Sequence, residues 1–488
     1  MATDASVETA SQTLHRLTSY VAYDAEDPDR IWAPPVDDPR VVADLVVNDT
    51  DRLPWFYKRY DEDLPRLALP RDLPTTTAST VAVLAGTTAI GSGTLDLAHL
   101  SRLLHLSAGV VRTMVRPYAT WLFRAAGSAG GRFPLEVYVA VPKGYDVPQG
   151  VHWYHPEAHA LVQIGPPPDA GAPTVVATGV PWRTGWRYRE RGYRHVYWDA
   201  GTMLSQLLAV ATSAGTEPSL FTRYPDVAVA SLVGADGTHE WPVAIVTLGG
   251  ETPAIGATGP AAVGSVDASP VEFPLVTAAQ RAGDLDAVGD PWRRASPVQT
   301  PITDGPPIDD VIMSKGSSRL LDRTKSVPHD LFETSMLAAM RGIDVSHTVA
   351  VQAVDGMTPG IYRWPATAPR REGDMRDELY RLAVEQELAQ AAAFVTIATA
   401  NIGALDDRSY REAQLSAGIV EGRLHLLAYA MGAAASGMTF ADDLLEDVVG
   451  EPADGLLLTC VGVPEYPSAI GGPPGSPTEV RRVEARTS

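Results

Sequence analysis

Apolar residues recur with two different periods along the first half of this 488-residue chain. Leucines stand at helical spacing over residues 95–106, which predicts an amphipathic helix. Short apolar runs over residues 137–141 and 174–179 are typical of strands. Two further runs, over residues 227–233 and 241–249, predict the strands that close this half.

The second half shows a similar pattern after a long interval. We expect a helix over residues 330–341, a strand that begins at His347 and another strand over residues 394–400. Longer helical patterns cover residues 375–393 and 417–432. Three short elements complete this half: a small-residue turn over residues 433–437, an acidic helix over 441–450 and a strand over 455–463.

Several stretches lack a clear period. Residues 186–198 are rich in arginine and aromatic residues, which predicts a loop before a helix over residues 199–214. The other irregular stretches set the expected domain boundaries. These are an N-terminal arm over residues 1–75, a first domain over 76–250, a linker over 251–312, a second domain over 313–465 and a tail over 466–488.

The two halves contain an internal repeat. Tyr193-Arg194 in the first half and Tyr410-Arg411 in the second are each followed by Ala-Gly, and the glycine comes eight residues after the tyrosine in both halves. The strands around these pairs also follow the same order. Chance similarity between two mixed segments is the alternative, but the matched spacing favours a duplicated α+β domain folded as a pseudo-dimer.

Composition narrows the class of protein. The formal net charge of -20 disfavours a nucleic-acid partner, because such proteins carry clustered lysine and arginine. The single cysteine, Cys460, excludes an internal disulfide and a cysteine metal cluster. No signal peptide and no apolar run long enough to span a bilayer are visible, so we expect a cytoplasmic protein without a membrane partner.

A small-residue turn, Ser128-Ala129-Gly130-Gly131, stands shortly before the strand over residues 137–141. Without bulky side chains, backbone N–H groups of such a turn can approach a flat or anionic ligand closely. A purely structural turn is the alternative. No metal site is expected, because the spacing of His152, His155 and His159 is not that of a helical zinc motif.

The order of motifs resembles the nitroreductase superfamily, and within it the azoline dehydrogenases of the streptolysin and thiopeptide type. In the first half the likeness lies in Ser128-Ala129-Gly130, in Pro134 and Glu136, and in residues 187–194. In the second half it lies in residues 315–319, 359–364 and 436–439. This resemblance, over roughly residues 12–465, implies an α+β fold of two tandem nitroreductase-like domains that form an intramolecular pseudo-dimer.

By resemblance, FMN binds where two such domains meet. One domain holds the phosphate and ribityl chain through a basic-serine-basic motif, and the other places a serine-glycine turn beside the ring system. Residues 75–93 contain no basic residue, and residues 340–349 contain no serine-glycine turn. The resemblance therefore implies one composite FMN site per chain. Its residues would be Ser128, Ala129 and Gly130 from the first half and Lys315, Ser317, Ser318, Arg319, Ser436, Gly437 and Thr439 from the second.

The family places a Lys-Tyr pair at the reacting centre, and this chain has Arg187-Tyr188 there. Arginine is effectively never deprotonated, so it cannot replace lysine as a base. Tyr188 can relay a proton if a nearby cation lowers its pKa. A tyrosine that merely packs under the sheet is the alternative.

The resemblance implies an FMN-dependent dehydrogenase that oxidises azoline rings to azoles in a ribosomally made precursor peptide. Its partners would be that peptide and the cyclodehydratase that makes the azolines, and homodimer formation stays open. Two other hypotheses are an NAD(P)H-dependent nitroreductase acting on a small molecule and a flavin-free scaffold of a biosynthetic complex.

Overall fold

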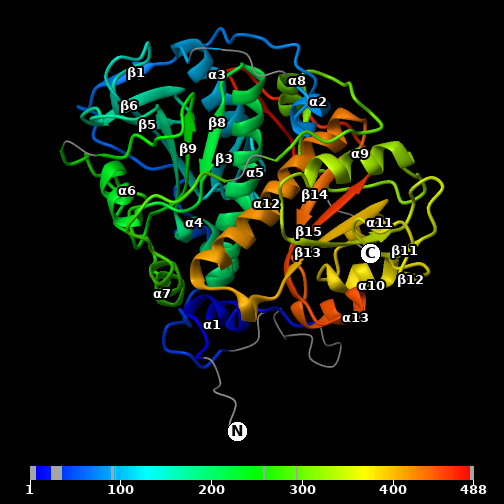
Figure 1. The fold of residues 1–488 in the computed structure, drawn as a ribbon. Helices are drawn as coiled ribbons and strands as arrows, with labels where there is room; N and C mark the ends of the chain where they lie inside the picture. The colour runs from blue at the N-terminus through cyan, green and yellow to red at the C-terminus, as the bar shows by residue number, and fades with distance from the viewer. Residues whose placement is uncertain are drawn as a thin grey trace.

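The structure of the chain is a computed structural model, which describes residues 7–22, 36–88, 93, 95–256, 259–292 and 295–483. Within these residues, two large sheets lie on either side of a central pair of helices (Figure 1). The first sheet consists of β1 (Arg66–Ala68), β6 (Ala160–Gly165), β5 (Gly150–His155), β4 (Leu135–Val141), β7 (Thr174–Gly179), β9 (Trp241–Leu248) and β8 (Pro218–Phe221), in that order. The second consists of β12 (Arg371–Glu372), β11 (Gly360–Arg363), β10 (Ser346–Val351), β13 (Phe394–Ala400), β15 (Asp454–Gly462) and β14 (Ala434–Met438).

The two sheets have the same topology. If β4 is matched with β10, then β5, β6, β7, β8 and β9 correspond in chain order to β11, β12, β13, β14 and β15, and the spatial orders agree at all six positions. All neighbouring strands in both sheets are antiparallel. The expected duplication is therefore confirmed, and the chain is an intramolecular pseudo-dimer of α+β domains.

The central helices are α5 (Gly192–Ser213) and α12 (Asp407–Ala430), which lie side by side (Figure 1). They touch through glycines. A Cβ on Gly201 would lie 2.4 Å from the backbone nitrogen of Ile419, and one on Gly418 would lie 2.4 Å from the carbonyl oxygen of Trp198. Real Cβ atoms do not approach so closely, so the Ala-Gly pair of each half marks the helix crossing rather than a helix start.

The other helices surround the sheets and the central pair. They are α1 (Ala10–Leu17), α2 (Thr80–Ala85), α3 (Leu97–Ala108), α4 (Pro181–Tyr188), α6 (Asp226–Val233), α7 (Pro274–Ala282), α8 (Ile308–Ser314), α9 (His329–Ala339), α10 (Arg376–Leu382), α11 (Glu387–Ala391) and α13 (Leu445–Val449). None of the helices in the described ranges is long and apolar enough to cross a membrane.

Buried ion pairs join the two halves in a symmetric manner. Arg194 on α5 donates to Asp442 of the second half at 2.9 Å. Arg411 on α12 donates to Asp226 of the first half at 3.3 Å. Each aspartate also pairs with the arginine three residues earlier in the chain: Asp442 with Arg191, just before α5, and Asp226 with Arg408 on α12. The repeated Tyr-Arg pair thus belongs to the contact between the halves.

Two predicted elements of the first half are wrong. Residues 227–233 form the helix α6 instead of a strand, because periodicity alone does not separate a short apolar run in a helix from one in a strand. Residues 186–198 are helical instead of a loop: they include the end of α4 and the first turns of α5. Their arginines look solvent-exposed in the sequence, but Arg191 and Arg194 are buried against Asp442.

The second half also differs from the predictions. Residues 433–437 lie largely in the strand β14, which pairs with β15, and do not form a turn. The helix expected over residues 375–393 is two short helices, α10 and α11. Val384 and Glu385 separate them with φ angles of 50° and 56°, which a right-handed helix does not permit.

Segments outside the two repeats pack onto them. The strand β1 extends the first sheet, and α7 lies within residues 251–312. The tail places β16 (Thr478–Glu479) beside β2 (Val110–Arg116), which pairs with β3 (Ala119–Arg124) in a small third sheet. The expected arm, linker and tail are thus in contact with the domains, while their exact limits stay predictions.

Candidate functional site

The turn of residues 128–131, called the Ser128 turn from here on, is fixed by two hydrogen bonds to Asp199 of α5. The Ser128 hydroxyl donates to Asp199 Oδ2 at 2.5 Å, and the Ala129 backbone N–H donates to Asp199 Oδ1 at 3.0 Å. Gly130 and Gly131 adopt φ angles of 59° and 65°, in the left-handed region that favours glycine. The turn is therefore fixed, and Gly130 at its tip is exposed.

Arg187 and Tyr188, at the end of α4, lie against this turn. A Cβ on Gly130 would lie 2.6 Å from Arg187 Cδ and 2.9 Å from the Tyr188 hydroxyl oxygen. The Tyr188 ring stacks on His195, with centroids 4.0 Å apart. Burial raises the pKa of Tyr188 to about 12, which outweighs the opposing effect of Arg187. The phenol is therefore protonated at neutral pH, contrary to the lowered pKa that a proton-relay role was expected to need.

Residues 315–319 of the second half meet the same turn from the other side. Lys315 directly follows α8 and is buried, and its Nζ donates to the carbonyl oxygen of Ala125 at 3.1 Å. A Cβ on Gly127 would lie 3.9 Å from the Ser317 hydroxyl oxygen, which is ordinary contact distance. The two segments that sequence reasoning assigned to one site are thus neighbours.

The neighbours of Ser317 differ in exposure. Ser318 is buried, and its hydroxyl donates to the carbonyl oxygen of Leu320 at 3.0 Å, so it faces away from the surface. Arg319 is exposed, and its backbone N–H donates to the Tyr466 hydroxyl at 3.0 Å. Ser317 is also exposed, so Ser317 and the Arg319 guanidinium are the groups of this segment that a bound anion could reach.

The third segment, Ser436, Gly437 and Thr439, lies at the end of β14. A Cβ on Gly437 would lie 3.2 Å from Glu421 Cγ, and the Gly437 backbone N–H hydrogen-bonds the Glu421 carboxylate. Gly437 is exposed and Ser436 is partly exposed. The Thr439 hydroxyl is buried with no hydrogen-bond partner among the described residues. Such an orphaned polar group indicates a place where a ligand group can bind.

Sequence reasoning missed two buried carboxylates at this junction, Asp199 on α5 and Glu421 on α12. Burial raises the pKa of Asp199 to about 7, against the opposing hydrogen bonds from Ser128 and Ala129. Burial also raises the pKa of Glu421, which accepts from the Thr202 hydroxyl at 2.6 Å and is attracted to Lys315. The available signal was an acidic residue close to the Ala-Gly pair of each helix: Asp199 directly precedes Ala200, and Glu421 comes three residues after Gly418.

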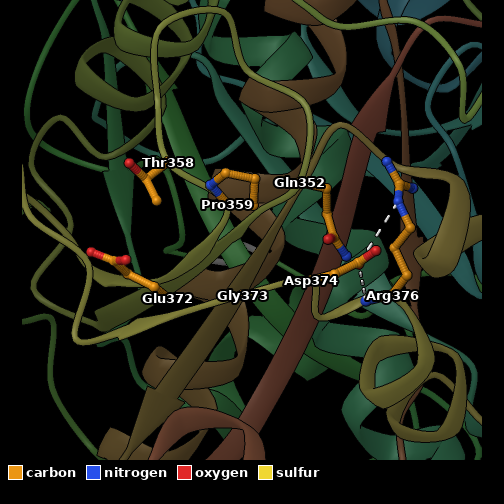
Figure 2. A pocket seen from close by; sticks show the side chains of 7 residues that line it. All are labelled: Gln352, Thr358, Pro359, Glu372, Gly373, Asp374 and Arg376. Carbon is orange, nitrogen blue, oxygen red and sulfur yellow. Dashed lines mark hydrogen bonds and ion pairs between the residues drawn. The ribbon is translucent and has the colours of Figure 1, made fainter.

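A narrow cavity adjoins the Ser128 turn. Most of its lining is apolar, from Ala108, Ala126, Phe133, Pro134, Leu135, Val137 and Met203, and Asp199, Ser128, Ser107 and Arg124 supply its polar groups. A larger, open hollow of about 390 Å³ lies on the second half, outside this junction. In Figure 2, Thr358, Pro359 and Glu372 stand on one side of it and Gln352, Asp374 and Arg376 on the other.

The internal repeat implies a second place, related to the candidate site by the pseudo-twofold symmetry, where the segment after α2 meets residues before β10. A side chain of the protein itself occupies this pseudo-equivalent place. Gly86 follows α2 as Lys315 follows α8, and the guanidinium of Arg341 packs against it. Arg341 Nε donates to the carbonyl oxygen of Leu84 at 3.0 Å, and Nη1 to that of Ala295 at 2.9 Å. No group of three or more histidine, cysteine or acidic side chains that could hold a metal occurs in the described ranges.

Comparisons with known proteins agree with this architecture. A candidate nitroreductase of Methanocaldococcus jannaschii is 31% identical over 140 residues, which cover 25% of this chain and 67% of that protein. The crystal structure of a candidate nitroreductase from Anabaena variabilis matches 94% of this chain and 100% of its own, with a TM-score of 0.69 and 22% identity. No profile of a known protein family matches.

A chain of the Escherichia coli microcin synthetase McbBCD complex, with truncated pro-MccB17 bound, matches 51% of this chain and 95% of its own. The TM-score is only 0.28 and the identity 16%, so this likeness supports no inference. The relative at 31% identity and the full-length fold match together define the class. The chain belongs to the nitroreductase superfamily, and its fold is two tandem nitroreductase-like domains.

Proposed function

We propose that this protein is an FMN-dependent oxidoreductase that oxidises azoline rings to azoles in a ribosomally made peptide. The observation that carries the proposal is the contact between the two halves at one place, where Ser317 approaches Gly127 beside the Ser128 turn. The motifs that hold the two ends of one flavin in the family would then serve a single cofactor. The pseudo-equivalent place is closed by Arg341.

The residues present fit an FMN. The exposed side chains of Ser317 and Arg319 can meet the phosphate, since a phosphate needs local cations and hydrogen-bond donors in a protein of net charge -20. The orphaned Thr439 hydroxyl and the exposed Gly437 offer further contacts. The turn with Ala129 and Gly130 would lie beside the ring. Bound FMN would supply the hydride acceptor for the oxidation.

The chain must manage the proton that leaves with the hydride, because conversion of a thiazoline to a thiazole removes one of each. Tyr188 lies next to the tip of the turn and keeps its own proton at neutral pH. Because the phenol is protonated, it can take the substrate proton only as it hands its own proton to water, so we infer a relay to solvent rather than a free base. Arg187, next to Tyr188, is exposed and would orient the peptide substrate, through the azoline ring or through the peptide backbone.

The expected partners are an azoline-containing precursor peptide and the cyclodehydratase that makes it. A second candidate is an NAD(P)H-dependent nitroreductase on a small molecule, which the name and 31% identity of the M. jannaschii relative favour. The two functions differ in the electron donor. The azoline dehydrogenase takes electrons from the peptide, whereas the nitroreductase takes them from NAD(P)H.

The deciding experiment measures flavin content and then both activities on the purified full chain. Extraction of FMN after denaturation, at close to one per chain, is expected. An azoline-containing peptide should reduce the bound flavin without NAD(P)H, and NAD(P)H with nitroarenes should not be consumed. NAD(P)H-driven nitroarene reduction without reaction on azoline peptides would select the second candidate, and a chain that neither contains nor takes up flavin would overturn both.

A further inference from the structure

The Ser128 hydroxyl has an unusual set of neighbours. It donates to Asp199 Oδ2 at 2.5 Å, while its oxygen accepts the Phe133 backbone N–H at 2.7 Å. A serine hydroxyl has one hydrogen and two lone pairs. With the hydrogen directed to Asp199 and one lone pair taken by Phe133, Ser128 can offer only a lone pair to any ligand on the turn.

Protonation of Asp199 reverses this arrangement. A proton on Oδ2 would donate to the Ser128 oxygen, which would then accept two hydrogen bonds and turn its own hydrogen outward. Oδ1 would keep the Ala129 N–H, now at 3.0 Å, so the turn would stay in place. One proton on a buried carboxyl thus exchanges an acceptor for a donor on the exposed side of Ser128.

The carboxylates are confined to one of the two pseudo-equivalent places. When Ala200-Gly201 is aligned with Ala417-Gly418, the position of Asp199 corresponds to Ser416 and that of Glu421 to Leu204. Both acidic residues therefore serve the junction that contains the Ser128 turn. The helix crossing is symmetric. If the acidic residues only stabilised this crossing, equivalent acidic residues would be expected at both pseudo-equivalent places.

Resting on the proposed function, we propose that Asp199 is a positioning residue whose protonation state sets whether Ser128 offers a hydrogen or a lone pair to the flavin. The edge of a flavin ring carries two carbonyl acceptors and one N–H donor, so a Ser128 hydrogen suits more of its groups. A neutral Asp199 also removes a negative charge from beside an anionic cofactor. The neutral form is therefore the tighter-binding form.

Two titratable groups, Tyr188 on α4 and Glu421 on α12, interact electrostatically with Asp199, and Arg124 on β3 lines the same cavity. Further groups lie beyond these two: Arg187 and His195 against Tyr188, and Lys315 against Glu421. Burial raises the pKa of Asp199 to about 7 against the hydrogen bonds from Ser128 and Ala129, and the Glu421 carboxylate adds a smaller upward shift. Burial lowers the pKa of His195 to about 3, so this ring stays neutral in the range where Asp199 titrates.

The test is the pH dependence of flavin affinity, measured by fluorescence quenching on the flavin-stripped full chain between about pH 5.5 and about pH 8.5, which brackets the titration of Asp199. Riboflavin is the main probe because it lacks the phosphate, which titrates near pH 6, and FMN is the second. We expect affinity to fall about three- to tenfold as pH rises through about 7, which is the size of one hydrogen bond.

Asp199→Asn should bind tightly at all pH values, because its amide nitrogen donates to Ser128 permanently. Ser128→Ala should also lose the pH dependence, with weaker binding throughout. Asp284→Asn is the matched control, since burial raises the pKa of Asp284 to about 6 and this carboxylate pairs with Arg411, away from the Ser128 turn. This variant should keep the wild-type profile.

The outcomes separate the two claims. If flavin binds and the variants Asp199→Asn and Ser128→Ala both keep the wild-type pH profile, the positioning role of Asp199 is wrong while the proposed function stands. If neither riboflavin nor FMN binds any folded variant at any pH, the proposed function fails and this inference fails with it. Thermal unfolding of each variant establishes that it is folded under the assay conditions.

Discussion

The rings of Tyr193 and Tyr410 lie almost parallel across the junction of the two halves, with centroids 6.4 Å apart and planes 10° apart. Each tyrosine directly precedes an arginine, Arg194 or Arg411, that pairs with an aspartate of the opposite half. Equivalent residues thus meet one another, as they do in the self-complementary interface of a twofold dimer. The motif repeats because one interface needs it twice.

The helix crossing makes a first prediction about Gly418. Alanine in place of glycine inside an exposed helix would stabilise by about 1 kcal/mol. At Gly418 the new Cβ would lie 2.4 Å from the carbonyl oxygen of Trp198 and force the central helices apart. We expect Gly418→Ala to lower the free energy of unfolding by about 2 kcal/mol or more, measured by urea titration. Gly256→Ala is the control, because no atom lies within 4 Å of that Cβ, and a stabilised Gly418→Ala variant would contradict the crossing.

The ion pairs across the junction make a second prediction. Asp226 bonds both Arg408 and Arg411, and all three side chains are buried. Asp226→Ala leaves two buried cations without this partner and should cost about 3–5 kcal/mol of unfolding free energy. Glu8→Ala removes a surface pair with Arg16, in which the two side chains are 40% and 61% exposed, and should cost less than about 1 kcal/mol. If Asp226→Ala and Glu8→Ala lowered the free energy of unfolding equally, the prediction that the junction ion pairs contribute more than a surface pair would be wrong.

The repeat was visible in the sequence because the distance from the Tyr-Arg pair to the Ala-Gly pair is the same in both halves. Both pairs of each half lie at the shared interface, which fixes this distance. The helical nature of residues 186–198 was not visible. There Arg191 and Arg194 look like surface residues, and only the distant Asp442 makes their burial possible. Long-range charge compensation has no local pattern.

The approach of the two halves at the candidate site was predicted in part. The neighbouring positions of Ser317 and Gly127 follow from complementary losses in the two halves, which a sequence can show. Asp199 was missed because its hydrogen bond to Ser128 depends on how closely α5 packs against the turn. The helical periodicity of α5 carries no information about that distance. The strand β14 was taken for a turn because small residues such as Gly437 suit both, and pairing with β15 decides between them.

Lys315 makes a third prediction, about cofactor affinity. Its ammonium is buried beside Glu421 and bonds the carbonyl oxygen of Ala125, so it compensates the acidic residues around the site. Lys315→Met should weaken FMN binding by about tenfold or more, because the buried acidic residues beside the cofactor would lose their compensating cation. The measurement is the dissociation constant of FMN by fluorescence titration. Lys325→Met is the control, since Lys325 is exposed and pairs only with Asp322 among the described residues. If both changes weakened FMN binding equally, the predicted role of Lys315 in the site would be wrong.

The last prediction concerns the pH dependence of stability. Burial raises the pKa of Asp199 from the ordinary 3.8 of an aspartate to about 7 in the folded chain. A carboxyl with a raised folded-state pKa binds its proton more tightly when folded, so its stabilising contribution is complete below about pH 4 and is lost as pH rises through about 7. Asp442 acts in another window, because Arg191 and Arg194 lower its pKa to about 2 against the effect of burial, and its contribution is lost only in acid.

The free energy of unfolding, measured by urea titration at about pH 5 and about pH 8, should therefore fall with rising pH, by about 1–3 kcal/mol through Asp199. Asp199→Asn cannot titrate and should flatten that part of the profile, with its stability relative to the wild type greatest at the higher pH. Asp442→Asn should leave the same interval unchanged in slope, because its window lies below it. A wild-type slope that survives in Asp199→Asn would mean that another group causes it and that Asp199 does not titrate between about pH 5 and about pH 8.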